Sequence, residues 1–260
     1  MLGAVAGDII GSRFEGQSSP PSDFELFHPD CRFTDDTVCA LAVADALLEG
    51  LDFARSLRTF VRRHPERGYG GMFLQWAFKE GAPAYGSWGN GAPMRVPAVG
   101  WLAKNEDDLL ELAKAQASVS HNHPDAIAAA QAVALAIFLA RHGVPRDSIR
   151  RNLMGRFGYD LTPERVLVGG HFDVSAAGTV KPALAAALES EDWESGVRTV
   201  ICLGGDTDTL ACITGAVAEA IHGIPAEVAD AARSHLTGDL VAVLTGFELA
   251  TGRSLVARTT

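Results

Sequence analysis

Helix signals recur along almost the whole chain, whereas runs of β-branched residues that could found a sheet are scarce. Thr34 can cap a helix that runs through about residue 48, with Val38, Leu41 and Leu48 on one broad face and Gly50 at its end. Further helices are predicted over residues 53–63, 71–79, 107–119, 124–142, 146–156, 181–189, 191–202, 208–222, 226–236 and 239–250. The fold class that follows is all-α, an orthogonal bundle of roughly a dozen helices.

Length and composition are those of an ordinary soluble globule, because 47% of the 260 residues are hydrophobic and 21% are charged. No repeat, low-complexity tract or long linker divides the chain, so residues 1–260 are expected to form one domain. The longest apolar stretch, 126–140, is interrupted by Gln131 and is shorter than the roughly 20 residues that a bilayer requires. It therefore predicts a buried core helix and no membrane span.

Charge and cysteine content narrow the class of protein further. The formal net charge of −10 argues against a surface that binds nucleic acid through its phosphates. The four cysteines lack the C-x-x-C spacing of zinc or redox sites and are expected to be reduced thiols, mostly in the core: Cys31, Cys39, Cys202 and Cys212. No charged, apolar leader precedes the first glycine-rich motif, so a cytoplasmic location is expected.

Two short acidic clusters stand far apart in the chain, and each opens an alanine-rich helical stretch: Thr34-Asp35-Asp36-Thr37 and Gly204-Gly205-Asp206-Thr207-Asp208-Thr209. Carboxylates taken out of water need a cation, hydrogen-bond donors or solvent, and oxygen-only ligands favour a hard ion such as Mg²⁺ or Mn²⁺. Neighbouring positions diverge by roughly 100° on a helix, so Asp35 and Asp36 could face two different ions. The hydroxyls of Thr34 and Thr209 could complete the coordination.

The same clusters also have a purely structural interpretation. Acidic residues in a first helical turn are favoured by the helix dipole and by free backbone N–H groups, so either cluster could be a helix cap. Two glycines directly before Asp206 allow a tight backbone approach that an ordinary cap does not need. This feature favours the metal site.

Two central segments carry candidate binding residues. Glycine-rich loops fill residues 66–97, where backbone amides can wrap a phosphate and Tyr85 or Trp88 offers a stacking surface for a base. In segment 120–125, Asn122 is expected to cap the next helix while one imidazole contacts a ligand. A purely structural role for this segment is the alternative.

The first fifteen residues combine small side chains with a later acid. Glycines spaced by four, at positions 3, 7 and 11, would let helices approach each other closely. Glu15, directly after Phe14, could project into a cleft, and an exposed surface position is the alternative.

In combination, five ordered blocks resemble the ADP-ribosylglycohydrolase family. The blocks are Gly7-Asp8 with Phe14-Glu15, Thr34-Asp35-Asp36-Thr37, Gly89-Asn90-Gly91 with Met94-Arg95, Ser120-His121 through Pro124-Asp125, and Gly205-Asp206-Thr207-Asp208-Thr209. The resemblance covers most of the chain. The chain departs from the pattern of the family mainly in length, over residues 17–33 and 155–180.

The resemblance implies an all-α fold and two Mg²⁺ or Mn²⁺ ions. The implied metal ligands are Thr34, Asp35, Asp36, Asp206, Asp208 and Thr209. It also implies that Glu15 lies on a mobile flap near the metals, that the loop from Gly89 to Met94 holds a diphosphate, and that His121 packs against the ligand. The expected substrate-binding residues are therefore Phe14, Gly89, Asn90, Gly91, Met94 and His121.

The implied reaction is hydrolysis of the bond from ribose C1 to a modified side chain, in an ADP-ribosylated protein or a small ADP-ribose conjugate. Asp36 or Glu15 would act as the general base. Arginine is marginally preferred to serine as the acceptor, because acidic surroundings favour a guanidinium leaving group. Three alternatives stay open: an ADP-ribose-binding module without turnover, a structural helical protein of crystallin type, and a dinuclear-metal phosphoester hydrolase.

Overall fold

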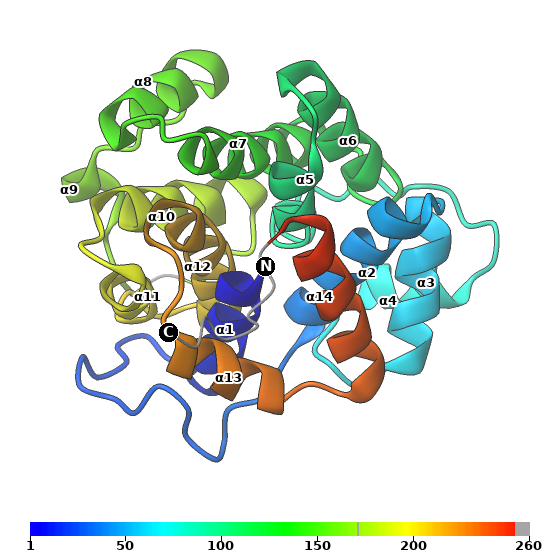
Figure 1. Cartoon of the computed structure of the whole chain (residues 1–260), viewed down its shortest axis with the longest axis horizontal. Coiled ribbons are helices and arrows are strands. Elements are labelled where there is room, and N and C mark those ends of the chain that lie inside the picture. Colours follow the sequence, from blue (N-terminus) through cyan, green and yellow to red (C-terminus); the bar gives the residue numbers. More distant parts are fainter. Residues whose placement is uncertain (171, 253–260) are drawn as a thin grey trace.

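The computed structural model describes residues 1–170 and 172–252, which form fourteen α-helices and one 3₁₀ turn without any strand (Figure 1). The helices are α1 (Leu2–Gly11), α2 (Asp35–Glu49), α3 (Phe53–Arg63), α4 (Gly71–Phe78), α5 (Pro97–Leu102), α6 (Glu106–Ser118), α7 (Pro124–Arg141), α8 (Arg146–Phe157), α9 (Pro163–Val166), α10 (Ala176–Glu189), α11 (Trp193–Ile201), α12 (Thr207–His222), α13 (Ala226–Ser234) and α14 (Gly238–Ala250), and the 3₁₀ turn is η1 (Ser12–Phe14). The predicted all-α fold is confirmed.

Most predicted helices agree with the observed ones to within two residues, and the largest difference is in α10. This helix begins at Ala176 instead of 181, because Ser175 caps it by accepting a hydrogen bond from the Gly178 amide at 3.0 Å. Pro182 lies inside the helix, where it removes one backbone hydrogen bond. Packing of α10 against α7, α11 and α12 offsets that loss. Helices α1, α5 and α9 have no counterpart among the predicted ranges.

The closest helix pair is α1 with α12, and glycines make the contact possible. Gly3, Gly7 and Gly11 lie along one face of α1, where a Cβ atom would overlap backbone oxygens of α12 or its first turn. The prediction that these residues allow close approach is confirmed. Because the two backbones touch, Asp8 of α1 is brought beside the N-terminus of α12.

Helix α7 is apolar and long enough to cross a membrane by length and composition alone. It lies in the interior, however, in contact with α5, α6, α8, α10 and α12 (Figure 1). Its buried side chains belong to the same hydrophobic cluster as those of α1, α2 and α12. The prediction of a core helix over this stretch is confirmed.

A long segment without helix joins η1 to α2 and runs around the outside of the bundle near α13 (Figure 1). The start of this segment is hydrogen-bonded to the residues just before α12. The Gly16 amide donates to the Gly205 carbonyl, and the Gly205 amide donates to the Gln17 carbonyl, both at 2.8 Å. Gly204 and Gly205 have φ of +75° and +84°, the left-handed region that favours glycine. These glycines therefore hold Glu15 next to Asp206.

Candidate metal centre and adjoining pocket

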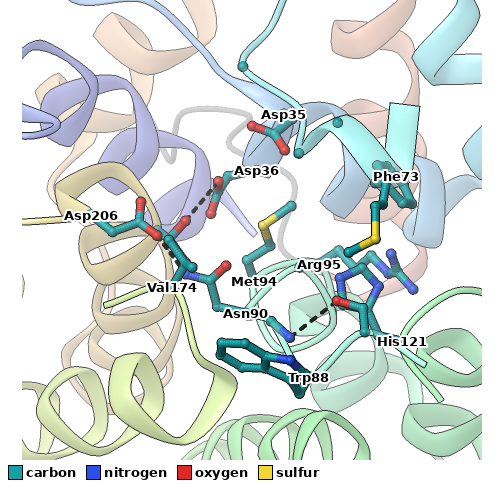
Figure 2. Close-up of a pocket in the computed structure, with 18 of the residues that line it drawn as sticks. Asp35, Asp36, Phe73, Trp88, Asn90, Met94, Arg95, His121, Val174 and Asp206 are labelled. Carbon is teal, nitrogen blue, oxygen red and sulfur yellow. Dashed lines mark hydrogen bonds between the residues drawn. The ribbon is translucent and has the colours of Figure 1, made fainter. Parts of the chain in front are cut away.

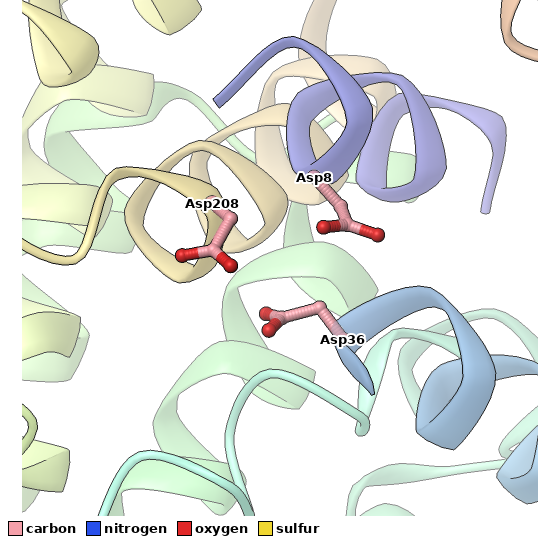
Figure 3. A group of neighbouring side chains, drawn as sticks. All are labelled: Asp8, Asp36 and Asp208. Atoms are coloured by element: carbon pink, nitrogen blue, oxygen red, sulfur yellow. The ribbon is translucent and has the colours of Figure 1, made fainter. Parts of the chain in front are cut away.

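Carboxylates from four separate segments converge at one point of the bundle. Asp8, Asp36 and Asp208 offer oxygens that lie within 4.8 Å of one another, and all three residues are buried (Figure 3). Glu15, Asp206 and Asp208 form a second such group, in which only Glu15 is exposed. Asp208 belongs to both groups, so the two candidate cation positions are adjacent.

Asp8 is the member of this centre that the sequence analysis did not assign. Its carboxylate accepts hydrogen bonds from the Thr34 amide at 2.9 Å, the Thr34 hydroxyl at 2.6 Å, the Thr37 amide at 3.2 Å and the Thr37 hydroxyl. Burial nevertheless raises the pKa of Asp8 to about 6. In the sequence, the signal that could have identified Asp8 was a single acid in an otherwise apolar helix. In the structure, most of the acceptor capacity of the Asp8 carboxylate is used in joining α1 to the start of α2.

Asp36 differs from Asp8 because one of its oxygens is not used. Its Oδ2 accepts a hydrogen bond from the Thr209 hydroxyl at 3.1 Å, while the buried Oδ1 has no hydrogen-bond partner. Burial, together with repulsion from Asp8 and Asp35, raises the pKa of Asp36 well above its usual range. A buried, unpaired carboxylate oxygen is costly, and a cation would satisfy it.

Asp208 lies in the first turn of α12, and its Oδ1 accepts a hydrogen bond from the Thr209 amide at 2.9 Å. Burial, followed by repulsion from Asp36 and Asp206, raises its pKa well above the usual range. None of the acids in the two groups makes an ion pair with a residue in the described part of the chain. A hard divalent cation fits this oxygen-only donor set better than hydrogen-bond donors alone do.

The remaining predicted ligands lie close to this centre but have other contacts. Asp35 is half-buried on the wall of the adjoining pocket and belongs to neither carboxylate group. The Thr34 hydroxyl donates to Asp8 and accepts from the Asp36 amide at 3.3 Å, which confirms Thr34 as the cap of α2. The Thr209 hydroxyl donates to Asp36. Coordination by these three residues stays a prediction.

A cavity of about 720 Å³ adjoins the acidic centre. Asp36 and Asp206 lie at one end of it and His121 lies at the other (Figure 2). Asp208 and the glycine-rich loop also line it. Of the predicted substrate-binding residues, Gly89, Asn90, Gly91, Met94 and His121 line the cavity. Phe14 does not line it, since its ring is buried against Phe24 with centroids 4.8 Å apart.

Asn90 links the glycine-rich loop to the acidic centre. Its side-chain amide donates to Asp206 Oδ2 at 2.6 Å (Figure 2). It also donates to the Thr179 hydroxyl at 3.1 Å. Its backbone amide donates to the Val174 carbonyl at 2.9 Å, and the Ala176 amide donates to the Trp88 carbonyl at 3.0 Å. The loop is therefore held rigidly between Asp206 and the residues that precede α10.

Arg95 is completely buried, and no carboxylate pairs with it among the described residues. Its Nε donates to Gln116 Oε1 at 2.8 Å, and its Nη2 donates to the Gln116 carbonyl at 2.7 Å and to Ser120 Oγ at 3.0 Å. Its Nη1 is buried without a hydrogen-bond partner. Burial lowers the pKa of Arg95 to about 10, so the guanidinium stays charged at neutral pH.

The contacts of Arg95 and Ser120 favour one tautomer of His121. Ser120 Oγ lies 2.8 Å from His121 Nδ1 and accepts a hydrogen bond from Arg95, so its own hydrogen is free to be donated to that nitrogen. In that arrangement we expect the imidazole hydrogen on Nε2, which faces the loop so closely that a Cβ on Gly91 would lie 2.6 Å from it. Burial and the charge of Arg95 lower the pKa of His121 well below 6.5, which keeps the ring neutral.

The expected cap at Asn122 is wrong. His123 is the N-cap of α7, because Pro124 occupies the first helical position and keeps its predecessor extended. The His123 Nδ1 accepts from the Asp125 amide at 3.2 Å. Asn122 Oδ1 instead accepts from the Gly86 amide at 2.7 Å, which holds the loop on the other side of the cavity.

Comparisons with known proteins point to a single family. A family model described as ADP-ribosylglycohydrolase matches residues 1–255. ADP-ribosylhydrolase ARH3 of Xenopus tropicalis is 25% identical, with 86% of each chain covered, and its Homo sapiens counterpart is 25% identical, covering 86% of this chain and 84% of its own. A solved structure titled "ADP-ribosylglycohydrolase-related protein complex" superposes with a TM-score of 0.77 at 26% identity, covering 96% of this chain and 95% of that one.

Proposed function

This chain belongs to the ADP-ribosylglycohydrolase family and is an ADP-ribosyl glycohydrolase, and from that premise we propose that it uses two divalent cations, Mg²⁺ or Mn²⁺, to release ADP-ribose from a modified side chain or small conjugate. The observation that carries the proposal is Asp208, which belongs to two carboxylate groups beside one large cavity. A shared carboxylate between two adjacent positions suits a pair of ions.

The residues that would hold the ions are Asp36 and Asp208 with Asp8 nearby at one position, and Asp206 and Asp208 with Glu15 nearby at the other. Thr34, Asp35 and Thr209 would complete the two coordination spheres. When bound, divalent cations would orient ribose hydroxyls and a water molecule and would make that water a better nucleophile. This role requires the deprotonated acids. Because the pKa values of Asp36 and Asp208 are raised, protons would compete with the cations for these carboxylates.

Glu15 is the better placed of the two candidate general bases. It is the exposed member of the carboxylate groups and lines the cavity, whereas Asp36 is buried between three helices and its Oδ2 already accepts a hydrogen bond. The segment that carries Glu15 is tied to Gly205, so its carboxylate is held near Asp206. A general base in this position contributes about 10² to 10⁴ in rate.

The rest of the cavity would bind the ADP moiety. The Gly91 amide and the Nε2–H of His121 would face the diphosphate, because the Gly89 and Asn90 amides already donate to Ser87 Oγ and to the Val174 carbonyl. The positive charge of Arg95 lies behind His121. At the cavity mouth, Trp88 and Phe172 are exposed aromatic residues that offer faces for a base.

A panel of purified conjugates tests the proposal: ADP-ribosyl-arginine and ADP-ribosyl-serine peptides, O-acetyl-ADP-ribose, poly(ADP-ribose) and a generic phosphodiester. We expect free ADP-ribose to appear with Mg²⁺ or Mn²⁺, to vanish with a chelator, and to be lost in Asp208→Asn. Tight binding of ADP-ribose without turnover of any conjugate would favour the binding module instead. Cleavage of the phosphodiester alone would favour the phosphoester hydrolase. A cytoplasmic location stays a prediction.

A further inference from the structure

A second cavity, of about 540 Å³, lies next to the metal centre and shares Glu15 with the first. It is formed by η1 and by the segment that follows it, and we refer to it as the acceptor cavity. The residues used in the argument are Arg13, Glu15, His28, Asp30 and Arg32, all of which line it. Because Glu15 stands between the two cavities, a group bonded to ribose C1 near Glu15 can extend into the acceptor cavity.

The acceptor cavity contains two arginines, Arg13 and Arg32, and the charge of Arg32 acts to lower the pKa of the neighbouring Glu15. Neither Arg13 nor Arg32 makes an ion pair with a residue in the described ranges. The Arg13 Nη1 is buried without a hydrogen-bond partner, and its guanidinium lies 4.5 Å from the centroid of the Phe14 ring. Asp30 is engaged with His28, at 3.2 Å. Arg13 and Arg32 are therefore the cationic side chains of this cavity that can attract an added anion.

The walls of this cavity are anchored to the helical core. The Arg32 amide donates to Ser12 Oγ at 3.1 Å, and Ser12 Oγ donates to the Ile9 carbonyl of α1 at 2.8 Å. The Gln17 side-chain amide donates to the Arg13 carbonyl at 3.2 Å. The backbone positions that carry the two arginines are therefore fixed within the cavity that Glu15 also lines, as a preformed binding site needs.

We propose that the acceptor cavity binds a phosphate or carboxylate carried by the acceptor next to the ADP-ribosylated atom, so that the enzyme prefers anionic conjugates. The inference rests on the proposed function. Guanidinium groups pair with both kinds of anion through parallel N–H···O contacts. A cationic guanidinium leaving group is repelled by the same two side chains, so this proposal replaces the marginal preference for arginine that the overall acidity favours.

The test uses one ADP-ribosyl-serine peptide with four choices of neighbouring residue: alanine, glutamate, phosphoserine and lysine. With the metal-loaded full chain, we expect kcat/KM to be about 5- to 10-fold higher for glutamate and phosphoserine than for alanine, mainly through KM, and lowest for lysine. Raising the salt concentration should reduce the difference. If phosphoserine alone is favoured, the anion is identified as phosphate; if glutamate is favoured equally, carboxylates are included.

Substitutions of Arg32 test whether the preference for anionic peptides arises in the acceptor cavity. Arg32→Gln should reduce the ratio of kcat/KM between glutamate and alanine peptides, and Arg32→Glu should invert the ratio between glutamate and lysine peptides. Arg151→Gln is the matched control, because Arg151 is exposed on α8 and also makes no ion pair among the described residues. Fluorescence anisotropy with labelled, unmodified phosphopeptide measures binding without turnover. The affinity for this peptide should fall from the wild type to Arg32→Gln and further to Arg32→Glu.

Three outcomes would contradict one or the other of the two claims. Equal kcat/KM for all four peptides in the wild type would overturn the anionic-acceptor inference and leave the glycohydrolase activity intact. Retention of the full preference in Arg32→Glu would also overturn it. A failure to release ADP-ribose from every conjugate, with metals present, would overturn the proposed function.

Discussion

At the scale of single residues, Asp36 couples metal binding to stability. Its Oδ1 is buried and unpaired, and it lies among other buried acids, so its charge destabilises the metal-free protein. We expect Asp36→Asn to raise the free energy of unfolding of the metal-free protein by about 1 kcal/mol or more, and to abolish the stabilisation that Mg²⁺ or Mn²⁺ provides. Thermal unfolding with chelator and with each metal measures both effects.

Asp107→Asn is the control for that experiment, because Asp107 is exposed in the first turn of α6. It should leave the metal-dependent rise in melting temperature unchanged. If Asp36→Asn kept the full metal-dependent rise, the assignment of Asp36 to the metal centre would be wrong.

Ser120 is expected to be a positioning residue for His121. In Ser120→Ala the hydrogen bond to Nδ1 is lost, so the imidazole hydrogen should redistribute between the two nitrogens and activity should fall by roughly tenfold. Ring ¹⁵N chemical shifts of His121 report the tautomer directly. Ser120→Thr keeps the hydroxyl and should restore the Nε2–H form. An unchanged ¹⁵N pattern in the alanine variant would contradict the assignment.

At the scale of elements, the contact between α1 and α12 determines the geometry of the metal centre. A Cβ on Gly7 would overlap the Ala211 carbonyl, and α1 can relieve this only by moving away from α12. We expect Gly7→Ala to lower the free energy of unfolding by about 1 to 3 kcal/mol and to weaken metal binding, because Asp8 and Asp208 move apart. Denaturant unfolding and metal titration calorimetry are the two measurements.

Gly155 of α8 provides the comparison within the same chain. It lies in a helix, and a Cβ there would meet nothing within 4 Å. Gly155→Ala should therefore stabilise the protein by up to about 1 kcal/mol and leave metal affinity unchanged. Equal effects of the two substitutions would show that helix propensity, and not the close packing of α1 on α12, governs both sites.

At the scale of the whole molecule, the buried acids predict how stability depends on pH. Burial raises the pKa of Asp8 from 3.8 to about 6, so between these pH values the folded state binds more protons than the unfolded state. The free energy of unfolding of the metal-free protein should then fall as the pH rises through this window. Asp36 and Asp208, whose pKa values are also raised, act in the same direction. His121, whose pKa is lowered, opposes them.

Thermal unfolding in chelator at pH 5 and at pH 7.5 measures this dependence. Asp36→Asn removes one of the titrating acids without changing His121, so it should reduce the loss of stability between the two pH values. The prediction fails if the wild type and the variant lose the same stability over this range. Bound divalent cations should diminish the dependence, since they require the deprotonated acids.

Local signals in the sequence were enough to predict the helical class, most helix positions and the acidic clusters. Thr34 and Gly50 are recognisable as the ends of α2 because capping depends on neighbouring residues only. The glycines at positions 3, 7 and 11 predict close helix packing for the same reason, since their spacing alone places them on one helix face. The five ordered blocks identified the family.

Tertiary structure decided what depends on contacts between distant residues. Asp8 enters the acidic centre only because α1 packs on α12, and its hydrogen bonds come from residues 26 and 29 positions away. The expected Nε2–H form of His121 depends on its contact with Ser120, which a buried arginine from another segment holds in place. Arg13 and Arg32 line one cavity with Glu15 only in the folded chain. Residue type and spacing determine helices, whereas the environment of a charge is created by the packing of the helices on one another.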